Sequence, residues 1–179
     1  MNFEWLDQEN KYIGHAFQVE KVRMRLPNGK TRSYDLVIHS GAVVLVPIDE
    51  NGRIWFVSQY RLGAKTNLLE LPAGTLDKDE DPFDCANREI REEIGMSASN
   101  ITKIGEMYLA PGYSTEYMHI YLATGLTHNP LAPDADEFLQ TEVIAFEKVY
   151  EMVSRGEIKD SKTLAALLLA KSHLNGIMD

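Results

Sequence analysis

The stretch from Gly74 to Met96, GTLDKDEDPFDCANREIREEIGM, contains the pattern that decides the fold. Its second half predicts a helix that begins near Asp81, because aspartate is a good N-cap residue and Pro82 suits the first helical position. Gly95 is a typical residue at which such a helix ends. An irregular acidic segment therefore leads into a helix of about three turns.

The predicted helix carries three glutamates whose positions relative to its apolar face indicate a candidate site. With roughly 100° of rotation per residue, Glu89 and Glu93 border the apolar face of the helix, whereas Glu92 lies further from it. The apolar face is formed by Phe83, Ala86, Ile90 and Ile94. A merely solvated acidic face would lie opposite these residues, so we expect Glu89 and Glu93 to be partly buried.

Like charges three and four residues apart on a helix repel one another, and their clustering needs an explanation. A hard divalent cation supplies one, because Mg²⁺ favours carboxylate oxygens and keeps open positions for water and phosphate. The alternative is a salt-bridged helix in which Arg88 pairs with Glu92.

Nine positions of the stretch follow the pattern G-x5-E-x7-R-E-U-x-E-E-x-G-U, where U is a bulky aliphatic residue. They are Gly74, Glu80, Arg88, Glu89, Ile90, Glu92, Glu93, Gly95 and Met96. This pattern resembles the signature of the Nudix hydrolases, with every fixed position filled. In that family the segment is a loop–helix–loop that binds Mg²⁺ or Mn²⁺ against a pyrophosphate, and the substrate is generally a nucleoside diphosphate linked to another group.

The resemblance implies roles for individual residues. Glu89 and Glu93 match the principal metal-binding carboxylates, and Glu92 matches a further ligand. The backbone carbonyl of Ala73 matches a metal ligand of the ADP-ribose pyrophosphatase branch, and Arg88 matches a mostly structural position. Glu93 and Glu92 are also expected among the catalytic residues.

Features outside the signature resemble the ADP-ribose and nucleoside-diphosphate-sugar pyrophosphatases, and the resemblance covers about residues 40–170. Pro111 lies 16 residues beyond Gly95, where that branch carries a proline, and residues 110–116 resemble its substrate loop. Residues 156–163 resemble the start of its last helix. The expected substrate-binding residues are Tyr60, Arg61, Glu70, Pro111, Gly112 and Glu116. For Tyr60 and Arg61 an ordinary surface position is an equally good interpretation, and Trp5 more often packs on a core than stacks on a base.

The catalytic base is the point at which the sequence departs from its relatives. Some members place the base in a D-E-D-E loop before the last strand, but this chain has Ala135 where the first glutamate would stand. Glu137 is the best remaining candidate for the base and Asp136 is the next. Glu92 is the alternative base, in which case the loop is only a solvated acidic segment.

The remaining chain predicts an α/β fold, and the resemblance implies a Nudix-type α/β/α sandwich with a mixed sheet. Residues 41–48 form a continuous apolar run that is typical of a buried central strand. Further strands are expected at 53–60, 101–110, 116–123 and 141–146, and further helices at 147–155 and 161–174. Residues 68–71 form a short apolar stretch that ends at Pro72. Residues 15–26 and 31–39 alternate around a turn at Pro27–Lys30 and predict a hairpin. We expect residues 1–40 to form a dimerisation lobe and residues 41–179 to form the hydrolase domain.

Composition limits the partners. Asp and Glu number 27 and Lys and Arg 18, and the net charge of −9 disfavours binding to nucleic acid. An anionic substrate would therefore need a cation to accompany it.

The single cysteine, Cys85, excludes an internal disulfide and is expected to pack in the core. The longest apolar run, Leu164–Ala170, is far shorter than the roughly 20 residues of a membrane span, and the start of the chain lacks a signal-peptide pattern. A cytoplasmic protein without membrane contact is expected.

The expected function is metal-dependent hydrolysis of the pyrophosphate bond of ADP-ribose or a related nucleoside diphosphate sugar. The products would be a nucleoside monophosphate and a sugar phosphate, and the expected assembly is a homodimer. Two alternatives stand: a nucleoside triphosphate pyrophosphatase, and a non-catalytic sensor that binds a nucleotide sugar.

Overall fold

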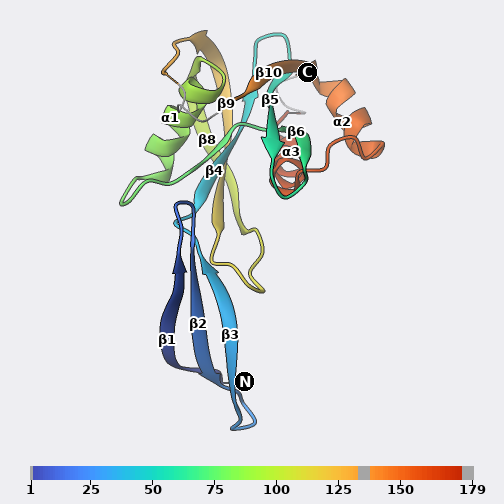
Figure 1. The fold of residues 1–179 in the computed structure, drawn as a ribbon. Coiled ribbons are helices and arrows are strands. Elements are labelled where there is room, and N and C mark those ends of the chain that lie inside the picture. The colour runs from blue at the N-terminus through green and yellow to red at the C-terminus, as the bar shows by residue number, and fades with distance from the viewer. Residues whose placement is uncertain (1, 133–137, 175–179) are drawn as a thin grey trace. The chain divides into compact units, whose positions relative to one another are not determined.

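The computed structural model describes residues 2–132 and 138–174 (Figure 1). The chain divides into two compact units. The N-terminal unit comprises Met1–Gly41 and Tyr108–Tyr117, and the larger unit comprises Ala42–Met107 and Met118–Asp179. The division after Gly41 is close to the expected boundary at residue 40, but a segment from the middle of the chain also belongs to the N-terminal unit.

The N-terminal unit is a three-stranded antiparallel sheet in the order β1 (Glu4–Ile13), β2 (Gln18–Arg25) and β3 (Thr31–Ile38). The predicted hairpin is present as β2 and β3. In its turn, the backbone N–H of Leu26 donates to the carbonyl of Lys30 at 2.8 Å, and Gly29 adopts a positive φ of 80°. Strand β1 was not predicted, because its residues are mostly polar and nearly all of them are exposed.

The segment 108–117 is held to the end of β3 by backbone hydrogen bonds. The N–H of Val37 donates to the carbonyl of Tyr113 at 2.8 Å, and the N–H of Thr115 donates to the carbonyl of Val37 at 2.9 Å. The N–H of His39 donates to Oγ1 of Thr115 at 2.9 Å. The expected substrate loop is therefore an ordered part of the N-terminal unit.

The larger unit is built on a seven-stranded mixed sheet in the order β10-β5-β4-β9-β8, with β6 paired to β5 and β7 paired to β4. Strands β4 and β9 are parallel, whereas β4 and β5 are antiparallel. The strands are β4 (Ala42–Ile48), β5 (Arg53–Arg61), β6 (Thr66–Glu70), β7 (Ala73–Thr75), β8 (Met96–Tyr108), β9 (Tyr117–His128) and β10 (Gln140–Ala145). All of the strands predicted in this unit are present, and β6 and β7 are additional short ones.

Helices cover both faces of this sheet. Alternate residues of β4 enter two separate cores: Val44 lies in the core that includes residues of α2 (Phe146–Ser154) and α3 (Ser161–Leu174), and Val43 lies in the core beneath α1 (Pro82–Glu93). Figure 1 shows α1 on one side of the sheet and α2 and α3 on the other. All seven residues of β4 are buried because both faces of the strand are covered. The expected α/β/α sandwich is confirmed.

Helix α1 begins and ends as predicted, with one error in its apolar face. The side chain of Asp81 accepts a hydrogen bond from the N–H of Phe83 at 2.8 Å, and Gly95 has a φ of 69°. The side chain of Phe83, expected in the core, is half exposed because it stands in the first turn, ahead of Ala86. Cys85 is fully buried in the core, as expected. None of the helices in the described residues combines the length and hydropathy that a membrane span requires.

Candidate active site

The buried carboxylates of α1 lie against the start of β7. Glu89 and Glu93 are each 7% exposed, in agreement with their predicted position beside the apolar face. The N–H of Ala73 donates to Oε2 of Glu93 at 2.9 Å. A Cβ atom at Gly74 would lie only 1.8 Å from Cδ of Glu89, so the carboxylate occupies the space that any larger residue would fill. Glycine at position 74 thus makes room for Glu89.

Arg88 organises the remaining carboxylates. Its guanidinium donates to Glu80, with Nε to Oε1 at 3.0 Å, and through Nη1 to Glu89 at 2.7 Å and to Glu92 at 2.8 Å. The hydrogen bond from Arg88 lowers the pKa of Glu80 to about 2. The Arg88–Glu92 pair of the salt-bridged interpretation is therefore present, but it coexists with the burial of Glu89 and Glu93.

The donor set suits a hard divalent cation. Among the described residues, no three carboxylate, imidazole or thiol groups are arranged as a metal site. Arg88 engages one oxygen each of Glu89 and Glu92. The available donors are nevertheless all oxygens, namely three carboxylates of α1 and the carbonyl of Ala73, and oxygen ligands are those that Mg²⁺ and Mn²⁺ prefer. The carboxylate of Glu89 lies against Gly74, in space that a larger residue would fill. The residues present fit the expected cation.

A second charged cluster lies at the end of β6. Arg61 donates to Glu70 in a two-pronged ion pair, with Nε to Oε1 at 2.8 Å and Nη2 to Oε2 at 2.7 Å, and Lys162 also binds Oε2 of Glu70. Burial alone would raise the pKa of Glu70, but the bonds from Arg61 and Lys162 hold it below its ordinary value. Glu70 is 1% exposed and contacts protein groups, whereas the sequence predicted direct contact with a substrate.

Tyr60 and Arg61 stand at the end of β5. Tyr60 is 58% exposed, and the side chain of Arg61 is 39% exposed beside its buried partner Glu70. The hydrogen bond to Glu70 raises the pKa of Arg61, and the charge of Glu93 contributes to the same shift. Arg61 is therefore within electrostatic range of a proposed metal ligand.

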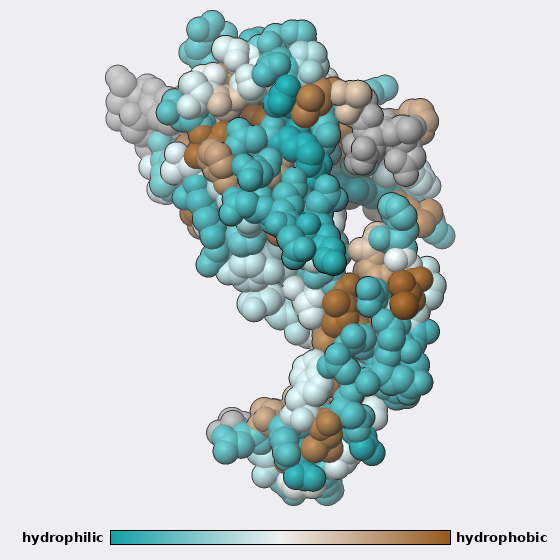
Figure 2. All heavy atoms as spheres, turned by 90° about the vertical axis from the view of Figure 1, so that its left-hand side faces the viewer, coloured by the Kyte–Doolittle hydropathy of each residue, from teal (hydrophilic) through white to brown (hydrophobic). Residues whose placement is uncertain are grey.

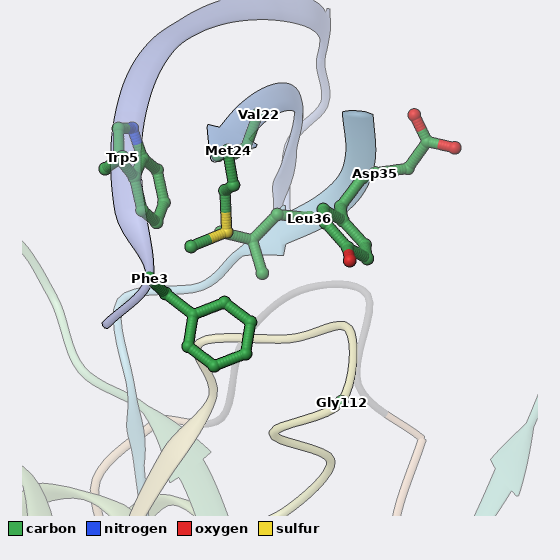
Figure 3. A pocket seen from close by; sticks show the side chains of 8 residues that line it. Phe3, Trp5, Val22, Met24, Asp35, Leu36 and Gly112 are labelled. Atoms are coloured by element: carbon green, nitrogen blue, oxygen red, sulfur yellow. The ribbon is translucent and has the colours of Figure 1, made fainter. Parts of the chain in front are cut away.

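Three expected substrate-binding residues, Pro111, Gly112 and Glu116, belong to the N-terminal unit. Gly112 lines an apolar hollow of about 190 Å³ in that unit, together with Phe3, Trp5, Val22, Met24, Tyr34, Asp35 and Leu36 (Figure 3). Trp5 is 50% exposed at this hollow, so the expectation that it packs in a core was wrong. On the face of the molecule seen in Figure 2, hydrophobic side chains form only small patches among hydrophilic ones.

Of the candidate bases, the structure describes Glu92 but not Asp136 or Glu137. Ala135, Asp136 and Glu137 lie outside the described residues. Glu92 is described, and its side chain is 18% exposed. Oε2 of Glu92 accepts a hydrogen bond from Arg88, so a proton taken up at this oxygen would break an existing ion pair.

Comparison with known proteins identifies the family. The family model of the NUDIX domain matches residues 38–167. The chain belongs to the Nudix family. An ADP-ribose pyrophosphatase of Mycobacterium tuberculosis is 35% identical over 178 residues, which cover 98% of this chain and 86% of that protein. An ADP-ribose pyrophosphatase of Bacillus subtilis is 33% identical over 162 residues, which cover 89% of this chain and 88% of that protein. The crystal structure of an ADP compounds hydrolase superposes with a TM-score of 0.87 at 25% identity, covering 98% of this chain and 96% of that one.

Proposed function

We propose that this Nudix protein hydrolyses the pyrophosphate bond of ADP-ribose or a related nucleoside diphosphate sugar with the help of Mg²⁺ or Mn²⁺. The products are a nucleoside monophosphate and a sugar phosphate, AMP and ribose 5-phosphate in the case of ADP-ribose. The observation that carries this proposal is the pair of buried carboxylates, Glu89 and Glu93, set against Ala73 and Gly74. The similarity to two ADP-ribose pyrophosphatases supports the substrate class.

In this proposal Glu89, Glu92 and Glu93 and the carbonyl of Ala73 hold the cation. When bound, a divalent cation neutralises the diphosphate, orients it and lowers the pKa of a water ligand. The burial of Glu89 and Glu93 excludes competing water from these carboxylates and strengthens their electrostatic interactions. The hydrogen bond from the N–H of Ala73 fixes the orientation of the Glu93 carboxylate.

For the base we propose Glu137, with Asp136 as the next candidate. A positioned carboxylate removes the proton as water attacks phosphorus. Glu92 is the alternative base, but its bond to Arg88 favours a structural and metal-binding role. Glu93 contributes to catalysis through the metal site.

The substrate contacts are proposed as follows. Arg61 meets the diphosphate, because its partly exposed guanidinium lies within electrostatic range of Glu93. Glu70 contributes through Arg61 rather than by direct contact. The nucleoside and the sugar are proposed to contact Tyr60, Pro111, Gly112 and Glu116.

The active enzyme is proposed to be a cytoplasmic homodimer. Phe3, Trp5 and Tyr34 of the N-terminal unit are exposed and line one apolar hollow, and a contiguous apolar patch is typical of a surface that meets a partner. We propose that residues 15–39 and 41–60 of one protomer help to shape the pocket of the other.

A hydrolysis screen tests this function. The purified full chain is incubated with Mg²⁺ and ADP-ribose, GDP-mannose, ADP-glucose, NADH, diadenosine polyphosphates or dNTPs, and the products are separated by ion-exchange chromatography. Preferred cleavage of a diphosphate sugar is expected. A preference for dNTPs would assign the protein to the triphosphate pyrophosphatases, and tight binding of a nucleotide sugar without turnover would identify a sensor.

A further inference from the structure

Four charged residues form a compact cluster where the end of β6 meets the start of α3. Glu70 is 1% exposed, and the side chains of Lys162 and Asp160 are 11% and 14% exposed. Arg61 is the fourth member and the most exposed. Two cations and two anions leave the cluster without net charge, as burial of ionised groups requires.

Lys162 is the member that connects both carboxylates. Its ammonium binds Oε2 of Glu70, the same oxygen that accepts from Nη2 of Arg61, and it lies 3.1 Å from Oδ2 of Asp160. With both cations in place, Glu70 stays ionised despite its burial, and its two oxygens can hold the Arg61 fork. The orientation of Arg61 therefore depends on a residue of α3.

The start of α3 also fixes the chain segment that leads to the metal carboxylates. The N–H of Leu71 donates to Oγ1 of Thr163 at 2.9 Å, and the N–H of Thr163 donates to Oδ2 of Asp160 at 2.9 Å. Two residues beyond Leu71, Ala73 makes its hydrogen bond to Glu93. One helix end thus holds both the arginine and the strand that carries a proposed ligand.

Arg61 has a donor left for a ligand. Nε and Nη2 are used by Glu70, whereas Nη1 donates to no other group in the described part of the chain. A guanidinium held from one side by a carboxylate is well arranged to offer its other side to a phosphate oxygen.

We infer that Lys162 is a positioning residue for hydrolysis, which acts through Glu70 to hold the guanidinium of Arg61 toward the diphosphate. This inference rests on the proposed function. Without the Lys162 ammonium, the buried carboxylates of Glu70 and Asp160 share the single guanidinium of Arg61. Arg61 is then drawn inward, or Glu70 takes up a proton and one of its two oxygens no longer accepts a hydrogen bond from Arg61. In either case the substrate meets a misplaced arginine.

A double-mutant cycle between Lys162 and Arg61 tests the inference. In the wild-type background, Lys162→Met is expected to lower kcat/KM by about 10- to 100-fold. In the Arg61→Ala background, the same substitution should lower kcat/KM by less than about threefold, because a residue that acts through Arg61 then has no guanidinium to position. Lys162→Arg retains the positive charge that pairs with Glu70 and should lose clearly less activity than Lys162→Met. Lys159→Met, which removes an exposed lysine of the same segment, is the matched control and should leave kcat/KM unchanged.

Equal losses from Lys162→Met in both backgrounds would overturn the inference and assign the lysine to general stability, and so would unchanged kinetics in the wild-type background. If Lys162→Met does not fold, Lys162→Gln enters the same cycle, since it removes the charge but keeps a polar side chain, one bond shorter than lysine, in the buried cluster.

A second readout does not require activity. The Nε–H signal of Arg61 in a ¹H–¹⁵N spectrum, assigned with Arg61→Lys, should be sharp in the wild type and broadened or lost in Lys162→Met. Loss of the signal in a protein that cleaves no diphosphate would support the positioning role and refute only the proposed function. A signal that stays sharp in Lys162→Met would overturn the inference whatever the activity.

Discussion

Gly74→Ala is the substitution whose effect can be worked most directly from the structure. The new Cβ would lie 1.8 Å from Cδ and from Oε1 of Glu89, whereas an ordinary van der Waals contact is 3.4–4 Å. The Glu89 carboxylate must therefore move by more than about 1 Å, and displacements of this size at a catalytic group cost on the order of 100-fold in rate. We expect kcat/KM to fall by about 100-fold, which corresponds to roughly 2.7 kcal/mol of transition-state stabilisation.

Metal affinity should fall together with the rate. Titration with Mn²⁺, followed by electron paramagnetic resonance of the free ion, is expected to show binding weakened by about 10- to 100-fold. Gly63→Ala is the matched control, because a Cβ at that position would meet no atom within 4 Å. Wild-type turnover and Mn²⁺ affinity in folded Gly74→Ala would refute the argument that glycine makes room for a metal-binding carboxylate.

Three further predictions concern the base, the assembly and acid stability. Glu137→Gln should lower kcat by about 10²–10⁴-fold with KM nearly unchanged, and Glu92→Gln should be milder; the reverse order in steady-state kinetics would exchange their roles. Light scattering at micromolar concentration should give a homodimer, and a fully active monomer would contradict the proposed assembly. The pKa of Glu80 is lowered from 4.5 to about 2, so the stability that its ionised form contributes is complete above about pH 4.5 and is lost as the pH falls toward 2. Urea unfolding of Glu80→Gln should therefore differ most from wild type near neutral pH and converge with it in acid, and a constant difference would refute this.

Local patterns predicted the parts of the site that lie on one element. Capping residues and the apolar period of α1 placed Glu89 and Glu93 beside the core, and both are buried. The apolar period predicted the wrong burial for Phe83, because the angle of a residue around the helix does not show which turns of the helix other elements cover. Strand β1 was missed because a strand with both faces exposed carries no alternation of apolar and polar residues.

The charged cluster at Glu70 could not be predicted from local patterns. Glu70 and Lys162 are separated by 92 residues, and only the packing of α3 against the end of β6 brings them together. From the sequence, Glu70 was expected to contact substrate and Lys162 received no role. The structure instead buries Glu70, whose carboxylate accepts hydrogen bonds from Arg61 and Lys162.

The metal dependence of ADP-ribose hydrolysis tests the central claim most directly. The full chain with Mg²⁺ is expected to release AMP and ribose 5-phosphate, and EDTA should abolish the reaction. Glu93→Gln should lower kcat by at least about 100-fold, a loss of roughly 2.7 kcal/mol, because it removes a charged oxygen donor from the buried pair. Full turnover in EDTA, or wild-type kcat in Glu93→Gln, would contradict the assignment of these carboxylates to a catalytic metal site.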